Sequence, residues 1–240
     1  LIVFCFVNIE IANTKPAPLG NKNAPKVGTF YFHLSSFPTT LNPLSSSDYY
    51  ASQVQSYVLE GLAARDTNTY EWVPGLAKSW TIAKDGKTFD FVLREGVKWH
   101  DGKPLTAEDV KFSFDAIMHP KNLYKTAHSK PYYENIKSVT ILSKNKVRFT
   151  TKKVYFKNFD VAAGITVVPK HIYENPSKKQ AKKLNKILIG TGPYILTKNK
   201  RGKSLEFKKN KDWWGSNVPY YKGMFNFKKV KMKAIKEDTL

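Results

Sequence analysis

Cysteine is nearly absent from this sequence of 240 residues, in which Cys5 is the single example. One cysteine cannot build a disulfide framework, and it cannot supply a thiolate cluster to a metal ion. The five histidines are scattered, and none forms a His-Glu-x-x-His pattern or a pair at ligand spacing on one predicted helix. We therefore expect neither a metal nor a cofactor, and a zinc hydrolase is disfavoured.

Motifs for covalent chemistry are missing as well. The sequence has no Gly-x-Ser-x-Gly pattern, so no nucleophile for a catalytic triad is evident. Gly202-Lys203-Ser204 is similar to the end of a phosphate-binding loop, but Thr197 occupies the position where that loop needs its first glycine. We expect no catalytic residues. A glycan hydrolase stays open as an alternative, because a sequence does not show whether two carboxylates face each other.

Arginine is rare, accounting for only 4 of the 40 basic residues. It is the residue that forks onto phosphates and reads guanine edges. Residues 1–120 carry a net charge of −1, whereas residues 121–240 carry +22. A basic half can bind nucleic acid or an anionic membrane surface. The scarcity of arginine favours the other interpretation, a solvated lysine surface with no specific nucleic-acid partner.

The sequence also lacks a hydrophobic run long enough to span a bilayer. Its apolar start, Leu1–Val7, leads into polar residues, and we interpret residues 1–13 as the remnant of a secretory signal peptide; a buried first strand is the alternative. Phe4 precedes Cys5, where a lipoprotein anchor needs a small residue, so a lipid anchor is not supported. Residues 14–27 are rich in Pro, Asn and Gly and predict a linker. We expect an exported, soluble, periplasmic protein.

The segment 74–110 is the most informative part of what is present. Gly75–Trp80 predicts a short helical turn, and Asp85-Gly86 between two alternating runs predicts a tight hairpin. After the hairpin, apolar residues alternate with polar ones such as Asp90, which predicts a strand with one buried face. The buried face is predicted to carry Phe89, Phe91 and Leu93.

A capped helix is predicted to follow. Thr106 is a good N-cap, and the acidic residues Glu108 and Asp109 lie in the first turn, where the helix dipole favours anions. Val110, Phe114 and Ile117 recur at helical spacing, and Pro120 is expected to end the helix.

The rest of the chain alternates between strand and helix patterns, which predicts an α/β protein. Asp48 or Ser47 is expected to cap an early helix, Pro169 to open a short helix, and Gln180–Ile187 to form a lysine-rich helix. The other predicted strands are Gly28–Ser35, Ile136–Leu142, Lys146–Thr151, Tyr194–Thr197, Ser204–Lys208 and Phe227–Ile235.

Adjacent aromatic residues recur along the sequence. Because neighbouring side chains on a strand point to opposite faces, one member of each pair is expected to face away from the core. Exposed aromatics in turns can serve as platforms for a ligand, or they can simply cover the edge of a sheet. The pairs are Tyr49-Tyr50, Tyr132-Tyr133, Trp213-Trp214 and Tyr220-Tyr221.

Seven short motifs, in the same order along the chain, make residues 28–240 resemble the peptide- and nickel-binding family of ABC-importer receptors, which includes oligopeptide- and dipeptide-binding proteins. The motifs identify a scaffold and leave its ligand open. They are Leu34–Pro43 (LSSFPTTLNP), Glu60–Leu62 (EGL), Val73–Trp80 (VPGLAKSW), Phe91–Gly102 (FVLREGVKWHDG), Leu105–Phe114 (LTAEDVKFSF), Gly190–Tyr194 (GTGPY) and Asn210–Trp214 (NKDWW).

The resemblance implies a periplasmic binding protein-like fold of two α/β lobes, the first of which carries an extra subdomain. Residues 28–61 would begin lobe one, 62–185 would form the extra subdomain, and 186–240 would return to lobe one. The chain is then expected to end before the second lobe, so that it represents lobe one and the subdomain only.

The resemblance also implies a ligand site and a function. It predicts an extracytoplasmic receptor, acting as a monomer, that captures oligopeptides and delivers them to an ABC permease in the inner membrane. Dipeptides, sugars or a nickel complex are alternative ligands on the same scaffold. Relatives often carry polar residues around Trp214, so specificity there is open. The implied ligand-binding residues are Ser45, Ser46, Ser47, Asp48, Tyr124, Trp213 and Trp214.

Overall fold

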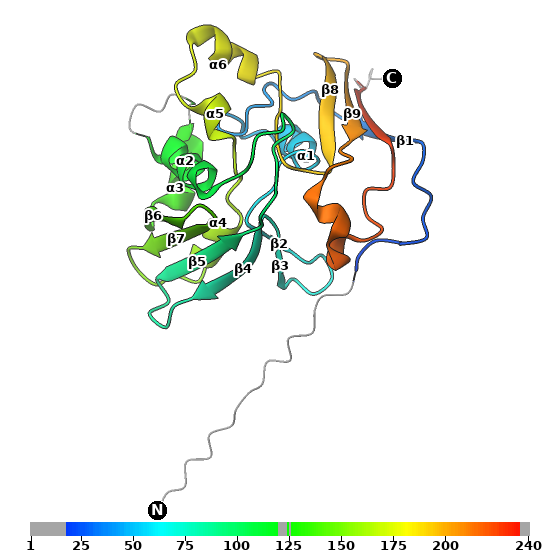
Figure 1. Ribbon diagram of the computed structural model, residues 1–240. Coiled ribbons are helices and arrows are strands. Elements are labelled where there is room, and N and C mark those ends of the chain that lie inside the picture. The colour runs from blue at the N-terminus through cyan, green and yellow to red at the C-terminus, as the bar shows by residue number, and fades with distance from the viewer. Residues whose placement is uncertain (1–17, 120–123, 125, 236–240) are drawn as a thin grey trace, which may run out of the picture.

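The computed structural model describes residues 18–119, 124 and 126–235 (Figure 1). The predicted signal-peptide remnant 1–13, Cys5 and Pro120 lie outside these residues, as do the first residues of the predicted linker and the last five residues of the chain. Within the described part, no helix is both long and apolar enough to cross a membrane.

Sheet one is mixed and combines two distant parts of the chain. Strand β1 pairs in parallel with β10, and the remaining pairs are antiparallel, in the order β1-β10-β9-β8. Because β1 and β10 run in the same direction, Leu34 and Ala234 are register partners at the same edge of the sheet. The strands are β1 (Thr29–Leu34), β10 (Lys229–Ala234), β9 (Ser204–Lys209) and β8 (Tyr194–Lys200).

Sheet two is antiparallel and lies within one continuous stretch of the chain, with the order β4-β5-β7-β6. A short ribbon of β2 and β3 precedes it. The division of the chain into lobe one and an extra subdomain stays a prediction. The strands are β2 (Ala63–Arg65), β3 (Trp72–Pro74), β4 (Ala77–Ile82), β5 (Thr88–Leu93), β6 (Ile136–Ser143) and β7 (Lys146–Thr151).

Helices lie beside both sheets: α1 is close to sheet one, while α2 and α3 lie next to sheet two (Figure 1). Three short 3₁₀ helices are Thr126–His128, Trp214–Asn217 and Pro219–Tyr221. The α-helices are α1 (Tyr49–Gln55), α2 (Ala107–Met118), α3 (Lys130–Tyr133), α4 (Asn158–Ala163), α5 (Lys170–Tyr173) and α6 (Lys178–Leu184).

The hairpin predicted at Asp85-Gly86 is confirmed, and it joins β4 to β5. The Asp85 carboxylate accepts from the backbone N–H of Lys87 at 2.8 Å, and Gly86 adopts a positive φ of 63°. The helical turn predicted at Gly75–Trp80 is wrong, because this segment enters β4 and pairs with β5. Pairing of its backbone with β5 overrides the local sequence pattern.

Strand β5 buries Phe89, Phe91 and Leu93 as predicted. The prediction that its other face is exposed is wrong at Asp90. Asp90, on the opposite face, is just 7% exposed. Its carboxylate accepts from Arg148 at 2.6 and 2.9 Å, a fork that covers it from the neighbouring strand β7. The guanidinium of Arg148 lowers the pKa of Asp90.

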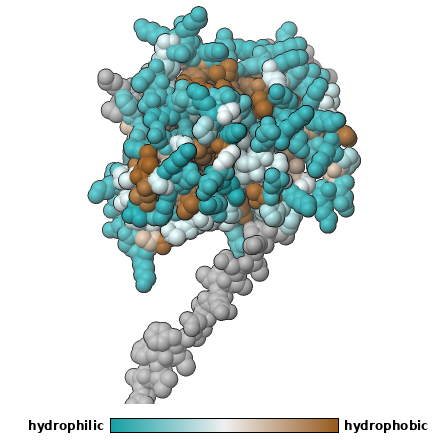
Figure 2. Space-filling view, in the orientation of Figure 1, coloured by the Kyte–Doolittle hydropathy of each residue, from teal (hydrophilic) through white to brown (hydrophobic). Residues whose placement is uncertain are grey.

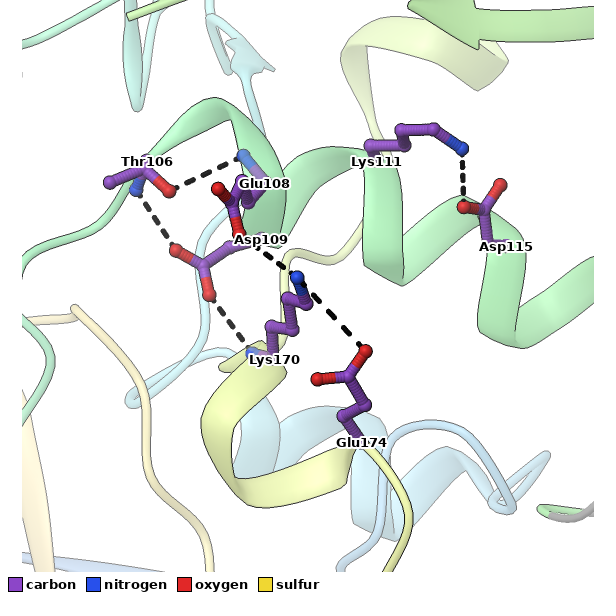
Figure 3. A network of polar contacts seen from close by, with 7 residues as sticks. All are labelled: Thr106, Glu108, Asp109, Lys111, Asp115, Lys170 and Glu174. Atoms are coloured by element: carbon purple, nitrogen blue, oxygen red, sulfur yellow. Dashed lines mark hydrogen bonds and ion pairs between the residues drawn. The ribbon is translucent and has the colours of Figure 1, made fainter. Parts of the chain in front are cut away.

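Helix α2 begins at the predicted cap and is tied to α5 (Figure 3). Thr106 and Asp109 form a reciprocal capping box, in which the Asp109 carboxylate accepts from the backbone N–H of Thr106 at 2.9 Å. The second carboxylate oxygen accepts from the backbone N–H of Lys170, also at 2.9 Å. One buried carboxylate therefore caps α2 and positions the start of α5.

Three clusters of buried side chains hold the elements together. The largest fills the space between sheet two and α2, and it contains Phe91, Val110 and Phe114. A second cluster packs α1 on sheet one, and a third joins the end of α2 to α5 and α6. The lysine-rich helix is displaced from its predicted position, since Ser177 caps α6 and the helix ends at Leu184.

The turn Gly190–Pro193 lies directly against the end of the α1 segment. The backbone N–H of Gly192 donates to the carbonyl oxygen of Val58 at 2.9 Å. A β-carbon on Gly190 would overlap this same carbonyl oxygen, and one on Gly192 would lie 2.8 Å from it. These two positions need glycine because the backbones touch there.

We expect Gly190→Ala to lower the free energy of unfolding by at least about 3 kcal/mol, because the new methyl group must push two backbones apart. The control is Gly96→Ala: Gly96 has a φ of 74° and open space around it. That control should cost about 1–2 kcal/mol from backbone strain alone. Chemical denaturation measures both variants, and equal effects would contradict the close approach.

Candidate functional site

The loop between β1 and α1 emerges from the edge of sheet one where β1 and β10 end. In open α/β sheets, ligands bind outside the carboxyl ends of parallel strands. Side-chain and backbone bonds give this loop a defined shape: Asn42 accepts from the backbone N–H of Leu44 through its side chain, and its carbonyl accepts from Ser45 and Ser46, all at 3.0 Å. We call Ser45–Asp48 the serine loop.

The structure brings Ser45 and Tyr124 together, two of the residues implied by the resemblance. The Ser45 hydroxyl donates to the carbonyl oxygen of Tyr124 at 2.7 Å, and the Tyr124 hydroxyl donates to the carbonyl of Tyr173. Tyr124 is only 5% exposed, and burial raises its pKa to about 12. Both hydroxyls serve the scaffold in this conformation. Their role in binding a ligand stays a prediction.

The other end of the serine loop caps α1. One oxygen of the Asp48 carboxylate accepts from the backbone N–H of Tyr50 at 2.8 Å, and the other accepts from the backbone N–H of Thr39 at 3.2 Å. The Ser46 hydroxyl in turn accepts from the backbone N–H of Asp48 at 3.2 Å. Asp48, one of the two predicted caps, is therefore confirmed as the N-cap. Its carboxylate and the Ser46 hydroxyl shape the loop.

Ser47 and the adjacent Tyr49 are the parts of this region that face outward. Ser47 is exposed, and its hydroxyl makes no hydrogen bond to another described residue. Tyr49 is 69% exposed and stands edge-on to Tyr50. An exposed serine hydroxyl and an exposed aromatic ring therefore lie two positions apart in the segment that follows β1, and a role for either toward a ligand stays a prediction.

Trp213 and Trp214 lie in a different place, around the carboxylate of Glu60. The Trp213 indole N–H donates to Glu60 Oε1 at 3.0 Å, and the Trp214 indole N–H donates to Oε2 at 2.7 Å. Trp213 is only 5% exposed. Trp213 is the member of this pair that faces the interior, because its indole N–H donates to Glu60 and its ring packs on Tyr221 and Phe225. The role of the two tryptophans toward a ligand stays a prediction.

Glu60 is the centre of this cluster. The hydroxyl of Thr191 donates to Oε2 at 2.6 Å, so the carboxylate accepts three hydrogen bonds. Burial raises the pKa of Glu60, whereas the bonds from Thr191, Trp214 and Trp213 and the charge of Arg94 oppose that shift. Arg94 lies 4.6 Å from the centre of the Trp214 ring. The carboxylate joins the segment after α1 to those around β8 and β9.

His100 holds the turn next to Glu60 from the other side. Its Nδ1 accepts from the backbone N–H of Gly190 at 3.4 Å, so Nε2 carries the proton and donates to the carbonyl of Gly192 at 3.0 Å. Burial lowers the pKa of His100, which favours this neutral form. The histidine has a structural role that its scattered position in the sequence did not suggest.

Sequence reasoning missed Glu60, Arg94 and His100 as a connected set. Glu60 offered one signal, an acidic residue placed between apolar residues (Val58-Leu59 before it and Leu62 after it), which is where an ionisable group needs partners. Across the residues that the structure describes, no three His, Cys, Asp or Glu side chains are grouped as a metal ion would require.

Comparison with known proteins identifies related scaffolds. Residues 71–240 match the sequence model of the bacterial extracellular solute-binding proteins, family 5 Middle. The chain is 33% identical over 200 residues to the dipeptide-binding protein of Escherichia coli strain K12. That match covers 75% of this chain and 37% of the relative, so the chain spans a little over one third of the relative's length.

Solved structures give the same result. NikZ from Campylobacter jejuni, in complex with Ni(L-His), superposes with a TM-score of 0.71 at 35% identity, covering 86% of this chain and 39% of that one. The oligopeptide-binding protein AppA from Bacillus subtilis, in complex with a nonapeptide, superposes with a TM-score of 0.72 at 26% identity, covering 88% and 40%.

We expect Glu60→Gln to destabilise the protein by about 2–3 kcal/mol, because an amide nitrogen replaces an acceptor oxygen and faces donors from Thr191 or a tryptophan. The matched control is Glu95→Gln, since the Glu95 side chain is 73% exposed and lies 3.6 Å from Lys78. The control should change stability by less than about 0.5 kcal/mol. Equal losses in chemical denaturation would show that the Glu60 bonds do not hold the cluster.

The wild type and Glu60→Gln also give a test of pH dependence. Because the native pKa of Glu60 is raised, the folded state binds its proton more tightly than the unfolded chain, whose pKa is about 4.3. The contribution of Glu60 protonation to the free energy of unfolding is fully present below about pH 4, and it is lost as the pH rises through the native pKa. The stability advantage of the wild type over Glu60→Gln should therefore shrink from acidic to neutral pH. An advantage that grows over this range would contradict a raised pKa.

Proposed function

Because the chain belongs to the bacterial extracellular solute-binding proteins of family 5, we propose that it is the substrate-binding component of an ABC importer and that it captures oligopeptides. Its fold is that of the two-lobe α/β periplasmic binding proteins, as predicted, and the chain aligns with about 40% of the length of the solved structures. Its work is capture and delivery of a ligand, with no covalent step.

The observation that supports the ligand proposal is that the segment from β1 to α1, which carries the serine loop, leaves sheet one at the carboxyl ends of β1 and β10. Strand β1 pairs only with β10 among the described strands, so one side of its backbone is not covered by the sheet. An extended peptide could bond to backbone groups here as an added strand does, while Ser47 and Tyr49 contact its side chains or amides.

The related proteins support peptides as ligands and leave the peptide length open. The curated relative is named a dipeptide-binding protein, and the AppA structure contains a nonapeptide. NikZ contains a nickel–histidine complex, so a nickel chelate is the second candidate ligand. Sugars are a further possibility on the same scaffold.

The proposed setting follows the family description. We place the protein outside the cytoplasm, in the periplasm, as a monomer that hands its ligand to a membrane permease. The lysine-rich half is the only feature that would favour nucleic-acid binding, and the family match gives no support for that function.

We expect peptides such as tri-alanine to bind the 240-residue chain weakly, with a dissociation constant on the order of 1 mM, because its residues supply only one wall of the proposed site. Chemical-shift changes in labelled protein should concentrate on residues 45–50. Ser47→Ala should weaken this binding by a few-fold, as expected for the loss of one hydrogen bond.

Ser143→Ala is the control, because Ser143 is also exposed but lies at the end of β6. Free alanine controls for nonspecific contacts, and nickel–histidine tests the second candidate. Shifts that appear with nickel–histidine but not with peptides would replace the peptide proposal. Shifts confined to lysine-rich strands would place the contact elsewhere.

A further inference from the structure

The loop that connects β7 to α4 displays an uninterrupted run of exposed side chains. We call it the 152–157 loop; its sequence is Lys-Lys-Val-Tyr-Phe-Lys, and all six residues are exposed. Val154 is 62% exposed, Tyr155 49% and Phe156 77%. Three adjacent apolar residues on the surface are unusual in a protein that has buried most of its large apolar side chains.

The base of this loop is held firmly. The Asn158 side chain, 2% exposed, donates to the carbonyl oxygen of Lys153 at 2.8 Å, and the Asn135 side chain donates to the same oxygen at 3.0 Å. The two amides also bond to each other, and Lys152 donates through its backbone N–H to the carbonyl of Asn135 at 2.8 Å. The apolar residues are therefore displayed by an ordered backbone.

The exposed rings pack on one another and stay outside. Tyr155 and Phe156 are edge to face, with ring centres 4.7 Å apart, and the Lys157 ammonium lies 5.5 Å from the centre of the Phe156 ring. The β4–β5 turn lies beside them, since a β-carbon on Gly86 would be 3.5 Å from the Val154 side chain. These side chains form a small apolar protrusion, and Tyr155 also lines a hollow beside it.

Lysines surround this protrusion. Lys152 and Lys153 flank it in the loop, and the adjacent turn adds Lys84 and Lys87. The structure gives Lys84, Lys87, Lys152 and Lys153 no ion pair within the described residues, whereas Lys157 pairs with Asp160 at 3.1 Å. Glu134 lies in the same surface hollow as Lys152, Lys153 and Tyr155. The carboxylate of Asp85 is occupied by backbone N–H groups of its own turn.

We propose that the 152–157 loop is a contact site for the surface of an anionic lipid bilayer. Val154, Tyr155 and Phe156 would enter the boundary between headgroups and acyl chains, and the surrounding lysines would lie against lipid phosphates. Aromatic residues are favoured at this depth, and each nearby lysine adds attraction to an anionic surface. The inference goes beyond ligand capture, because it uses no residue of the serine loop.

The charge pattern is the reason for choosing lipid over a protein pocket. A protrusion with an apolar centre and lysines before and after it in the loop complements a surface that is anionic outside and apolar beneath. Figure 2 shows hydrophobic surface among hydrophilic atoms on the side that carries sheet two in Figure 1. The exposed apolar residues, and not the net charge of residues 121–240, distinguish this loop from the rest of the surface.

Vesicle binding tests the proposal with two matched double variants. Tyr155→Ser with Phe156→Ser removes the exposed rings, and Ile141→Ser with Leu142→Ser removes two other exposed apolar residues (38% and 41% exposed) at the far end of the same hairpin. Both variants keep every charge. On phosphatidylglycerol–phosphatidylcholine vesicles the first should bind at least about tenfold more weakly, and the control should bind like the wild type.

Equal binding by both double variants would overturn the proposal, because it would assign vesicle binding to lysines alone. So would a lack of binding by the wild type, and a protein partner would then be the better occupant. Circular dichroism checks that the variants are folded.

A probe at position 156 gives a second, independent readout. In a Cys5→Ser background, Phe156→Cys carries an environment-sensitive fluorophore, and Leu142→Cys carries it in the control. Anionic vesicles should shift the emission to the blue at position 156 only, and pure phosphatidylcholine should give a smaller shift. No shift at 156, or the same shift at both positions, would overturn insertion of the loop.

Discussion

The carboxylate of Glu60 is the interaction on which the arrangement of this chain depends. It receives hydrogen bonds from Thr191, before β8, and from Trp213 and Trp214, after β9, while its own backbone follows α1. A half-buried carboxylate needs hydrogen-bond partners, and these three segments meet to supply them. The bonds fix how the helix at the start of the chain sits on sheet one, and the close glycine turn at Gly190 allows the backbones to approach far enough for the bonds to form.

The connection to sheet two continues from the same point. The carbonyl of Gly61, directly after Glu60, accepts from the backbone N–H of Leu76 at 3.1 Å, and Arg94 donates to the carbonyl of Gly75 at 2.7 Å. Ser45 and Tyr124 form a second tie near the proposed ligand surface. The serine loop is fixed at one end by Ser45 and at the other by Asp48, which would hold Ser47 in place for the proposed ligand. The other polar side chains of the loop, Ser45, Ser46 and Asp48, form hydrogen bonds within the protein.

The parts that could be predicted from the sequence depend on neighbours along the chain. The Asp85-Gly86 hairpin, the Thr106 cap and the buried residues Phe89 and Phe91 follow from local turn, cap and alternation rules, and all are confirmed. The Gly75–Trp80 segment was wrongly predicted because its conformation is set by pairing with another strand. The Glu60 cluster spans more than 150 positions, so no local pattern could indicate it.

The burial of individual aromatic residues could not be predicted from the sequence either. Trp213 and Phe156 are both large rings in loop regions, yet one is 5% and the other 77% exposed. Their partners differ: Trp213 donates to Glu60 and packs on Tyr221 and Phe225 from another segment, whereas the ring contact of Phe156 is with its neighbour Tyr155. An aromatic ring that stays outside on a firmly held backbone has lost the benefit of burial. The bilayer contact proposed for the 152–157 loop would offset that loss.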